Sequence, residues 1–361
     1  MSVRVLIIGA GNAGLRIAEG LARSSRVDRL VLCDISRDRA PLVGAILDSC
    51  YDCDVKFIEL DGTRQKSVEE VLRTKKPDLV LQSACLLSPW ATLGRSDPTS
   101  QALSQAGLAV QLPVQLPVLT TVMKAVRQVD FKGPVANLSF PDVTHMILDR
   151  FGLAPTVGLG NVSICHLRVR AALRKTSMKT HGSCAPFPLI RLVGHHHHVY
   201  GVMEATPPAD PQESCRVYLG ERGERADELA YQGFPIKTGI DFNIITAAAA
   251  LRVLLALLPG AEPLRFSAPA PQGLPGGYPV VISDGKVELD LPETVDLTEA
   301  KELHQRMARL DGIESISDDG TVQFSEKAKK AVADIDPALS EPLRVKEWIP
   351  RALLLKRHVG A

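Results

Sequence analysis

The sequence lacks the features that mark nucleic-acid-binding, exported and membrane-spanning proteins. Its 42 Lys and Arg residues nearly balance its 41 Asp and Glu residues, so the net charge of +1 offers no field to hold a polyanion. The first ten residues have neither a basic segment nor a small-residue cleavage site, which is typical of a strand and not of a signal peptide. The most apolar later stretch, Ile244–Leu258, contains Arg252 and is too short to cross a bilayer. We therefore expect a cytoplasmic protein that binds neither nucleic acid nor a membrane.

Cysteine is scarce, and its pattern does not suggest a disulfide framework. An odd number of scattered cysteines in a long chain is typical of reduced thiols in a cytoplasm. Cys50 and Cys53 have the spacing of a thiol pair, but the sequence holds no second such pair for a four-thiolate zinc site. The seven cysteines are Cys33, Cys50, Cys53, Cys85, Cys165, Cys184 and Cys215.

The length and composition predict two domains, the first of which is α/β. A chain of 361 residues with 45% hydrophobic residues exceeds what one compact core usually serves. In the first part, strands are expected at 3–8, 29–34, 55–60, 79–83 and 134–139, and helices at 13–23, 39–49, 67–75 and 117–128. This alternation predicts right-handed crossovers and a doubly wound parallel sheet, a Rossmann domain, over residues 1–140.

The second part, residues 141–361, is expected to be an α+β domain. Strands are expected at 162–173 and 188–193, loops at 205–214 and 259–279, a hairpin at 280–289, and helices at 241–258, 298–310 and 325–333. The 259–279 segment is assigned to loop because its prolines and glycines sustain neither a helix nor a strand. The Asp284-Gly285 pair is typical of a hairpin turn.

A glycine-rich turn after the first strand predicts a dinucleotide site. Gly9, Gly11 and Gly14, with Asn12 and Ala13 between them, follow an apolar strand and open a helix. The first glycine permits the tight turn, the second lets the backbone approach a pyrophosphate, and the third lets the helix pack closely on the strand. The phosphates are then expected on the helix N-terminus, where free N–H groups favour negative charge.

The ends of the other predicted strands complete this site and favour NAD. Asp34 lies about 20 residues after the glycines, where a carboxylate accepts hydrogen bonds from the adenosine ribose. It would repel the 2′-phosphate of NADP, although Arg37 and Arg39 lie close by. The other expected contacts lie at the carboxyl ends of strands or just beyond them: Ile35, Asp61, Ser83, Ala84 and Asn137.

From this point the order of landmarks along the whole chain resembles the lactate/malate dehydrogenase superfamily, which also includes NAD-dependent, metal-assisted glycosidases. The landmarks are 31–35, 39–48, 93–97, 192–196 and 273–286. The resemblance implies hydride transfer between a nicotinamide and a small polar, carboxylate-bearing substrate. The resemblance places Arg95 in a mobile loop, where the arginine polarises the substrate carbonyl. It also makes His196 the catalytic acid/base.

The substrate half departs from that pattern. The dehydrogenases carry an Asp that orients the histidine and, three residues later, an Arg that binds the substrate carboxylate. One register places Cys165 and Arg168 there, the other Ile164 and Leu167, and neither supplies an Asp. Phe140 stands where the family has an Asn, so Asn137 or Ser139 would have to replace that Asn by side-chain reach.

The run His195–His198 lies where the resemblance expects catalysis. If this segment is extended, His195 and His197 face one way and His196 and His198 the other. His196 matches the dehydrogenase base, and His197 matches the metal-binding histidine of the glycosidases. A divalent metal on His197 with Cys165 or His166 is possible by ligand type but is not expected.

Three functions remain open at this point. The first is an NAD-dependent dehydrogenase with His196 or His197 as acid/base and Arg168 and Arg95 as anion-binding residues. The second is a glycosidase or lyase that uses NAD and a metal, and the third is an NAD-binding sensor or scaffold without turnover. Asp241 is expected to cap the apolar helix that follows it. The apolar surface of that helix, together with the family resemblance, favours a homodimer or homotetramer.

Overall fold

The N-terminal part is a six-stranded parallel sheet in the order β3-β2-β1-β4-β5-β6, as expected for a doubly wound domain. The computed structural model describes residues 2–93, 95–181 and 187–360. The elements of this part are β1 (Arg4–Ile8), α1 (Asn12–Arg23), β2 (Arg29–Asp34), α2 (Ala40–Cys50), β3 (Asp54–Glu59), α3 (Gln65–Lys75), β4 (Leu79–Gln82), η1 (Pro89–Ala91), α4 (Pro98–Ala106), η2 (Leu108–Gln111), α5 (Leu112–Gln128), β5 (Val135–Asn137), α6 (Pro141–Asp149) and β6 (Val157–Gly158).

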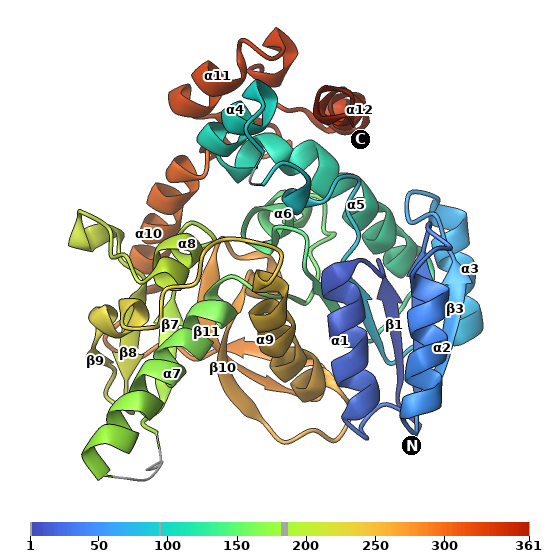
Figure 1. Cartoon of the computed structure of the whole chain (residues 1–361), viewed down its shortest axis with the longest axis horizontal. Coiled ribbons are helices and arrows are strands. Elements are labelled where there is room, and N and C mark those ends of the chain that lie inside the picture. Colours follow the sequence, from blue (N-terminus) through green and yellow to red (C-terminus); the bar gives the residue numbers. More distant parts are fainter. Residues whose placement is uncertain (1, 94, 182–186, 361) are drawn as a thin grey trace.

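Alternating side chains on β1 divide the core into two layers. Val5 and Ile7 pack in one cluster with α1, α2 and α9 (Phe242–Leu257), whereas Leu6 and Ile8 pack in another with α3, α5 and α6. Because both faces are covered by helices, the central strands β1 and β4 are apolar over most of their length, whereas the edge strand β3 keeps charged, exposed residues. Figure 1 shows α1 and α9 side by side, which joins the two parts of the chain.

The remaining chain forms small antiparallel sheets and helices, in agreement with an α+β arrangement. The sheets are β7-β8-β9, β10-β11-β12 and β13-β14. The elements are α7 (Val162–His181), β7 (Ile190–Val193), α8 (His198–Glu204), η3 (Pro211–Glu213), β8 (Arg216–Leu219), β9 (Glu224–Arg225), η4 (Asp227–Tyr231), α9 (Phe242–Leu257), β10 (Leu264–Pro269), η5 (Pro271–Gly273), β11 (Gly277–Ser283), β12 (Lys286–Leu289), α10 (Leu297–Leu310), β13 (Ile313–Ile316), β14 (Val322–Phe324), α11 (Glu326–Val332), η6 (Pro337–Leu339), η7 (Val345–Glu347) and α12 (Trp348–Val359).

The parallel sheet extends past the boundary expected at residue 140. Its edge strand β6 pairs in parallel with β5 and belongs to the same sheet. At the other end of the chain, α11 packs against α4 and α12 against α5 (Figure 1). The C-terminal helices therefore cover the N-terminal part, and the two halves of the sequence share their cores.

Two secondary-structure predictions were wrong. Residues 162–173 belong to helix α7 and not to a strand, because the Ala, Leu, Arg and Lys residues that follow the β-branched start favour a helix. Residues 259–279 are not all loop, since β10 pairs with β11 and the register places Pro279 opposite Ser267. Pro279 is tolerated because β12 pairs with β11 only from Val280 onward, so the missing N–H falls at a ladder end.

Smaller corrections concern helix starts. Helix α5 begins at Leu112, so Pro113 takes the first-turn position that was expected of Pro117, which lies inside the helix. Asp241 stands at the start of α9 but makes no side-chain cap hydrogen bond. Among helices of the described residues, 108–128 is long and apolar enough to cross a membrane, but 78% of its apolar window is buried, as in a core helix.

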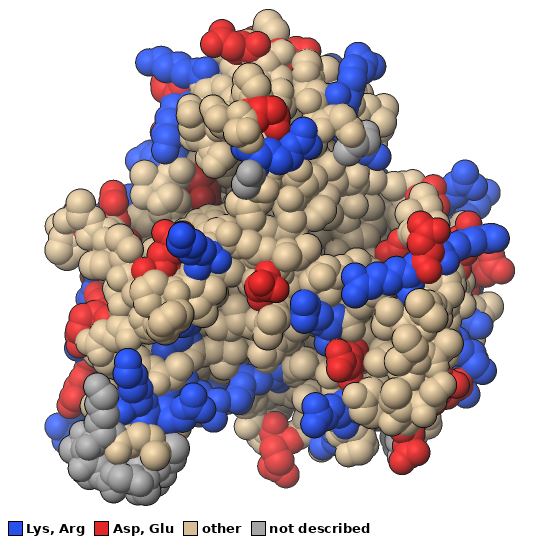
Figure 2. All heavy atoms as spheres, in the orientation of Figure 1, with Lys and Arg blue, Asp and Glu red and all other residues tan. Residues whose placement is uncertain are grey.

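The cysteines and surface charges are arranged as the composition suggests. The six cysteines within the described residues are free, and Cys184 lies outside those residues. Figure 2 shows Lys and Arg side chains interspersed with Asp and Glu over the face that it presents. That face therefore carries no extended patch of one sign.

Replacing Gly9 by alanine is expected to destabilise the fold by about 1–3 kcal/mol. Its φ is +104°, and an added Cβ would lie 2.4 Å from the Ala84 backbone nitrogen. Urea denaturation measures this loss of unfolding free energy. Gly11→Ala is the control, because Gly11 has φ −71° and no atom within 4 Å of such a Cβ. Equal losses in both variants would contradict this account.

Candidate active site

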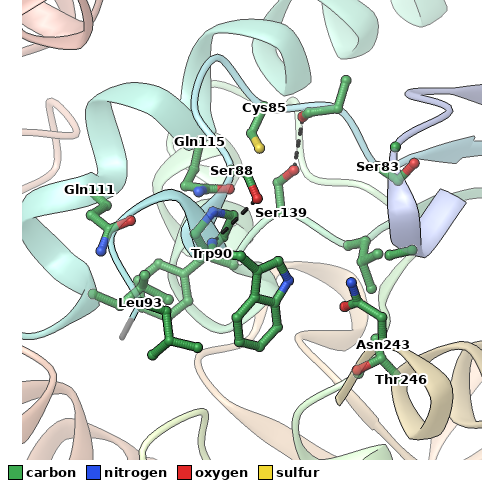
Figure 3. A pocket seen from close by; sticks show the side chains of 18 of the residues that line it. Ser83, Cys85, Ser88, Trp90, Leu93, Gln111, Gln115, Ser139, Asn243 and Thr246 are labelled. Atoms are coloured by element: carbon green, nitrogen blue, oxygen red, sulfur yellow. Dashed lines mark hydrogen bonds between the residues drawn. The ribbon is translucent and has the colours of Figure 1, made fainter. Parts of the chain in front are cut away.

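One cavity of about 990 Å³ extends from the glycine-rich turn to the end of α10. It is bordered by the ends of β1, β2 and β4, residues within 85–93, Arg95, α4, the start of α5, the histidine run and the start of α9. Figure 3 shows part of it, with Ser83 and Asn243 on one side and Gln111 and Leu93 on the other. The predicted residues that line it are Gly9, Gly11, Asn12, Ala13, Gly14, Asp34, Ile35, Asp61, Ser83, Ala84, Arg95, His196 and His197.

The glycine turn forms a cradle whose middle is open. A Cβ on Gly14 would lie 2.1 Å from the Gly9 carbonyl oxygen, so that contact between helix and strand requires glycine. At Gly11 an added Cβ meets no described atom within 4 Å, and no side chain caps α1 there. The free N–H groups of the first turn of α1 therefore face space into which an anionic group can fit.

Asp34 stands at the end of β2, on the edge of the same cavity. Its Oδ2 accepts a hydrogen bond of 2.7 Å from the Ala10 N–H, and its Oδ1 accepts one of 2.9 Å from the Ser36 N–H. Arg37 is paired with Glu59 and does not neutralise Asp34. The carboxylate is fixed by the backbone, and lone pairs remain for ribose hydroxyls.

Asn137 is the one predicted cofactor residue that does not line the cavity. It is buried, its Oδ1 accepts from the Ser139 N–H at 2.9 Å, and its amide donates to Thr144. Ser139 does line the cavity, but its hydroxyl donates to the Ala84 carbonyl at 3.0 Å (Figure 3). The amide of Asn137 therefore holds the turn between β5 and α6.

The histidine run is a turn between β7 and α8 and not an extended segment, so the alternation of faces expected for an extended segment does not apply. Nδ1 of His196 lies 2.7 Å from Oδ2 of Asp311, and Nδ1 of His197 lies 3.2 Å from Oδ1 of the same residue. Because an ionised carboxylate only accepts hydrogen bonds, both imidazoles donate through Nδ1. Consecutive histidines converge on one carboxylate, and Nε2 of His196 is left as an acceptor.

The ion pair changes the pKa values of both partners. Burial lowers the pKa of His196, but the charge and hydrogen bond of Asp311 more than compensate, and the net shift is above its usual 6.5. Burial raises the pKa of Asp311, but His195, His196 and His197 reverse this effect and hold the pKa far below its usual 3.8. Asp311 is therefore ionised at neutral pH, and His196 titrates above 6.5.

His195 and His198, the remaining members of the run, have structural roles. Nδ1 of His198 accepts from the His195 N–H at 2.9 Å, and its Nε2 lies 2.9 Å from the Glu213 carbonyl oxygen, to which it donates. Burial lowers the pKa of His198 to about 3 and also lowers that of His195. Both rings are neutral at physiological pH, and neither borders the cavity.

Asp142 and two aromatic rings position His196. The Oδ1 atom of Asp142 accepts from the His196 N–H at 3.0 Å, and its other oxygen accepts from the Asn161 amide. Phe140, with ring centroid 5.1 Å away, and Tyr200, at 5.4 Å, contact the imidazole edge-on. Phe140 therefore packs against the histidine at the point where the resemblance expected a polar Asn.

Asp311 was missed by sequence reasoning, which looked for this aspartate near Cys165. It stands at the C-terminal end of α10, 115 residues after His196. The available signal was local: a carboxylate at the carbonyl end of a helix opposes the helix dipole and needs a compensating partner. Because Asp311 supplies that carboxylate, the missing aspartate no longer argues for a scaffold without turnover.

The two predicted arginines do not form a carboxylate clamp. Arg168 is buried away from the cavity and donates to the Phe234 carbonyl at 2.7 Å, so the expected role in binding substrate is not supported. Arg95 borders the cavity, but its Nε lies 2.9 Å from Asp97 and its Nη1 lies 3.2 Å from the Val359 carbonyl. Asp97 and the carbonyl end of α12 therefore already bind this guanidinium.

The possible metal ligands are not brought together. Cys165 is buried in a separate apolar cluster, while His197 faces Asp311. No group of three His, Cys, Asp or Glu side chains in the described part of the chain is arranged to hold a metal ion. Burial raises the pKa of Cys85, the thiol in the cavity, to about 11, so it is not an activated thiolate.

Replacing Asp311 by asparagine is expected to cost about 3–5 kcal/mol of stability, because it leaves buried imidazoles without their counter-ion. Folding lowers the pKa of Asp311, so its contribution is present above 3.8 and is lost as the pH falls through the folded value. Folding raises the pKa of His196, so the stability that His196 contributes is complete below pH 6.5 and is lost as the pH rises through its pKa in the folded protein. The difference between the proteins should peak near about pH 5.

Urea denaturation across pH and an NMR titration of His196 measure these effects. In Asp311→Asn, burial and the smaller opposing effect of the Asp142 charge remain, and burial should bring the His196 pKa below 6.5. Asp318→Asn is the control, since the Asp318 side chain is fully exposed. An unchanged His196 pKa in the Asp311 variant would disprove the assigned pair.

Comparison with known proteins finds similarity in structure only. No protein-family model and no curated protein matches the chain. Similar solved structures include the lactate dehydrogenase MGS-M5 from a Medee basin deep-sea metagenome library, with TM-score 0.51 and 14% identity over 86% of this chain and 96% of that one. The malate dehydrogenase of Picrophilus torridus matches with TM-score 0.52 and 14% identity over 93% of this chain and all of that one.

A third similar structure is the lactate dehydrogenase of Eimeria maxima with NADH and oxamate, with TM-score 0.51 and 14% identity over 85% of this chain and 91% of that one. At such identities the likeness concerns the fold. The chain therefore has the fold of the lactate and malate dehydrogenases, as its order of sequence landmarks predicted.

Proposed function

We propose that this protein is an NAD-dependent oxidoreductase that interconverts a carbinol and a carbonyl group of a small polar substrate, with His196 as the acid/base. The observation that supports this most is the His196–Asp311 pair on the wall of the cavity that begins at the glycine cradle. No hydrogen bond joins Nε2 of His196 to another described residue, so this nitrogen is available to a substrate. A histidine that titrates above 6.5 suits proton transfer near neutral pH.

The cradle fits the cofactor. Gly11 and the first turn of α1 would hold the pyrophosphate, and Asp34 would accept hydrogen bonds from the adenosine ribose and disfavour a 2′-phosphate. The lactate dehydrogenase of Eimeria maxima, which has the same fold, was solved with NADH. When bound, NAD supplies the acceptor for hydride that the side chains lack.

The acid/base step uses groups that are already oriented. Neutral His196 accepts the hydroxyl proton at Nε2 as the alcohol is oxidised, and its Nδ1–H stays on Asp311. The carboxylate stabilises the imidazolium that forms, and in the reverse direction the same Nε2 returns the proton. His197 makes the longer bond to Asp311 and is more exposed, with 39% of its side-chain area accessible against 13% for His196. His196 is therefore the better candidate.

Aromatic side chains lower the polarity of the site around His196. Phe140 and Tyr200 flank the imidazole, and Trp90 packs edge-on against Phe242, with centroids 6.2 Å apart, in the cavity wall. A low-polarity wall strengthens the His196–Asp311 interaction and any hydrogen bond to the reacting oxygen.

We also propose that the enzyme acts in the cytoplasm as a homodimer or homotetramer. Ile244 in the apolar helix α9 and Leu42 and Ile46 in α2 are at least half exposed, which supports an association through these helices.

Replacing His196 by glutamine should lower the rate of NADH formation about 10²–10⁴-fold, because the proton acceptor is lost. The affinity for NAD should not change, since the cradle is formed by other residues. Absorbance of NADH with a panel of small alcohols measures the rate, and calorimetry measures NAD binding. His358→Gln on α12 is a matched control, because that histidine pairs with Asp336 and does not line the cavity. Full turnover in the His196 variant would refute the assignment.

The pH dependence should report the titration of His196. Oxidation of the alcohol needs the neutral imidazole, so kcat/KM should rise with pH through a value above 6.5 and then level off. Reduction of the carbonyl needs the imidazolium, so its rate should fall through the same value. In Asp311→Asn the acid limb of the oxidation profile should move below pH 6.5. If the pH profile of the Asp311→Asn variant were the same as that of the natural protein, Asp311 would have no part in setting the protonation of the catalytic histidine.

A further inference from the structure

The cavity holds a buried amide that has no partner. Gln115, on the second turn of α5, is 2% exposed and borders the cavity. Its Nε2 atom is shielded from solvent and makes no hydrogen bond to any described residue. Leaving such a group unpaired costs about 1–3 kcal/mol, and buried polar groups are nearly always satisfied. The partner of Gln115 is therefore expected to be a ligand.

Neutral polar side chains from α4 and the segment that leads into α5 line the same cavity as this amide. Residues four apart lie on the same face of a helix, and three such pairs from these segments border the cavity. Gln111, one turn before Gln115, is 9% exposed. Figure 3 shows Gln111, Gln115 and Ser88 around one part of the cavity. The Ser100 hydroxyl and the Gln101 amide already donate to Asp97 and to the Ser96 carbonyl, so the set offered to a ligand is Ser88, Ser104, Gln105, Gln111 and Gln115.

This amide–hydroxyl cluster adjoins the acid/base pair. The Ala109 N–H donates to the Asp311 carbonyl at 3.0 Å, while the carboxylate of the same residue holds His196. Gln111 follows Ala109 by two residues and Gln115 by one further turn. The cluster therefore lies at the reacting end of the cavity, where a substrate extends from His196.

Lys and Arg side chains at this end are few, and Arg95 is already paired. Within the described lining, Arg95 and Lys327 are the Lys and Arg side chains, and both residues are exposed. Arg95 is bound by Asp97 and by a carbonyl of α12. A buried arginine fork, the usual means of binding a carboxylate, is absent from this part of the described lining.

The chemistry of the cluster selects an uncharged partner that both donates and accepts. Amides and hydroxyls both donate and accept hydrogen bonds, and an alcohol group on the ligand can do the same. A carboxylate only accepts hydrogen bonds, and here no paired cation would compensate for the removal of its charge from water. Trp90 and Leu93 add an apolar surface below the two glutamines in Figure 3. Carbon chains that carry several hydroxyls present both kinds of surface.

We propose that the substrate is a neutral polyhydroxylated compound, and that Gln115 and Gln111 determine this specificity. The inference rests on the proposed oxidoreductase function, since it names the substrate class of the same site. Oxidation of one carbinol breaks its C–H and O–H bonds, delivers hydride to NAD⁺ and a proton to His196, and yields one carbonyl compound and one NADH. In this proposal Gln115 binds the hydroxyl groups of the substrate and takes no part in proton transfer.

The test compares threitol with threonate, which have the same number of carbons but differ in a terminal alcohol or carboxylate. Calorimetry with the NAD-saturated protein measures binding, and NADH absorbance measures turnover. Threitol should bind at least ten-fold more tightly than threonate, and erythritol and erythronate should repeat the order. Tighter binding of the carboxylates, or binding of neither class, would overturn the inference. Threitol binding without NADH would support the inference and contradict the proposed function.

Gln115→Met removes the amide at nearly constant volume. It should weaken threitol binding about ten-fold, with kcat little changed and NAD affinity retained. The unliganded variant should be at least as stable to urea as the natural protein, because an unpaired buried amide is lost. Gln128→Met, at the exposed end of the same helix, is the matched control.

Gln111→Met tests the same surface if the first variant does not fold. It should also weaken threitol binding and leave NAD binding unchanged. An equal loss of NAD affinity in either variant would assign these glutamines to the cofactor and overturn the proposal, and unchanged threitol binding in both would do the same.

Discussion

The buried carboxylate of Asp311 joins three parts of the chain that are far apart in the sequence. Its two oxygens hold His196 and His197, and the backbone carbonyl of the same residue accepts from Ala109 in η2. The end of α10, the turn after β7 and η2 therefore meet at one residue. An ion withdrawn from water is stable only when such partners are fixed around it, so the positions of His196 and of the neighbouring glutamine face are set together.

The glycine turn and the parallel sheet could be predicted from the sequence because their signals are local. The glycines at 9, 11 and 14 act within one strand–turn–helix unit, and Asp34 follows at a spacing that the parallel sheet imposes. The parallel sheet follows from alternating strands and helices. The same reasoning failed for α7, since β-branched residues at a helix start resemble a strand until the helical residues that follow are weighed.

The surroundings of the histidine run could be predicted only in part because their contacts are not local. The histidine run was recognised, but the bend that brings His195, His196 and His197 toward one carboxylate cannot be inferred from consecutive identical residues. Arg168 had the residue type expected of a carboxylate-binding group, yet α7 directs it to the Phe234 carbonyl. Residue type indicated the chemistry, whereas the tertiary fold decided which residue was placed to perform it.

The separation of 115 residues between His196 and Asp311 has a consequence for how the protein is made. As the chain leaves the ribosome, the glycine turn and the histidine run are synthesised before the carboxylate that pairs with His196. A chain that ends before residue 311 therefore lacks the charged pair, and it also lacks α11 and α12, which pack against α4 and α5. The charged pair can form only after α10 and the turn at Gly312 are in place, so this wall of the cavity is among the last parts of the protein to be completed.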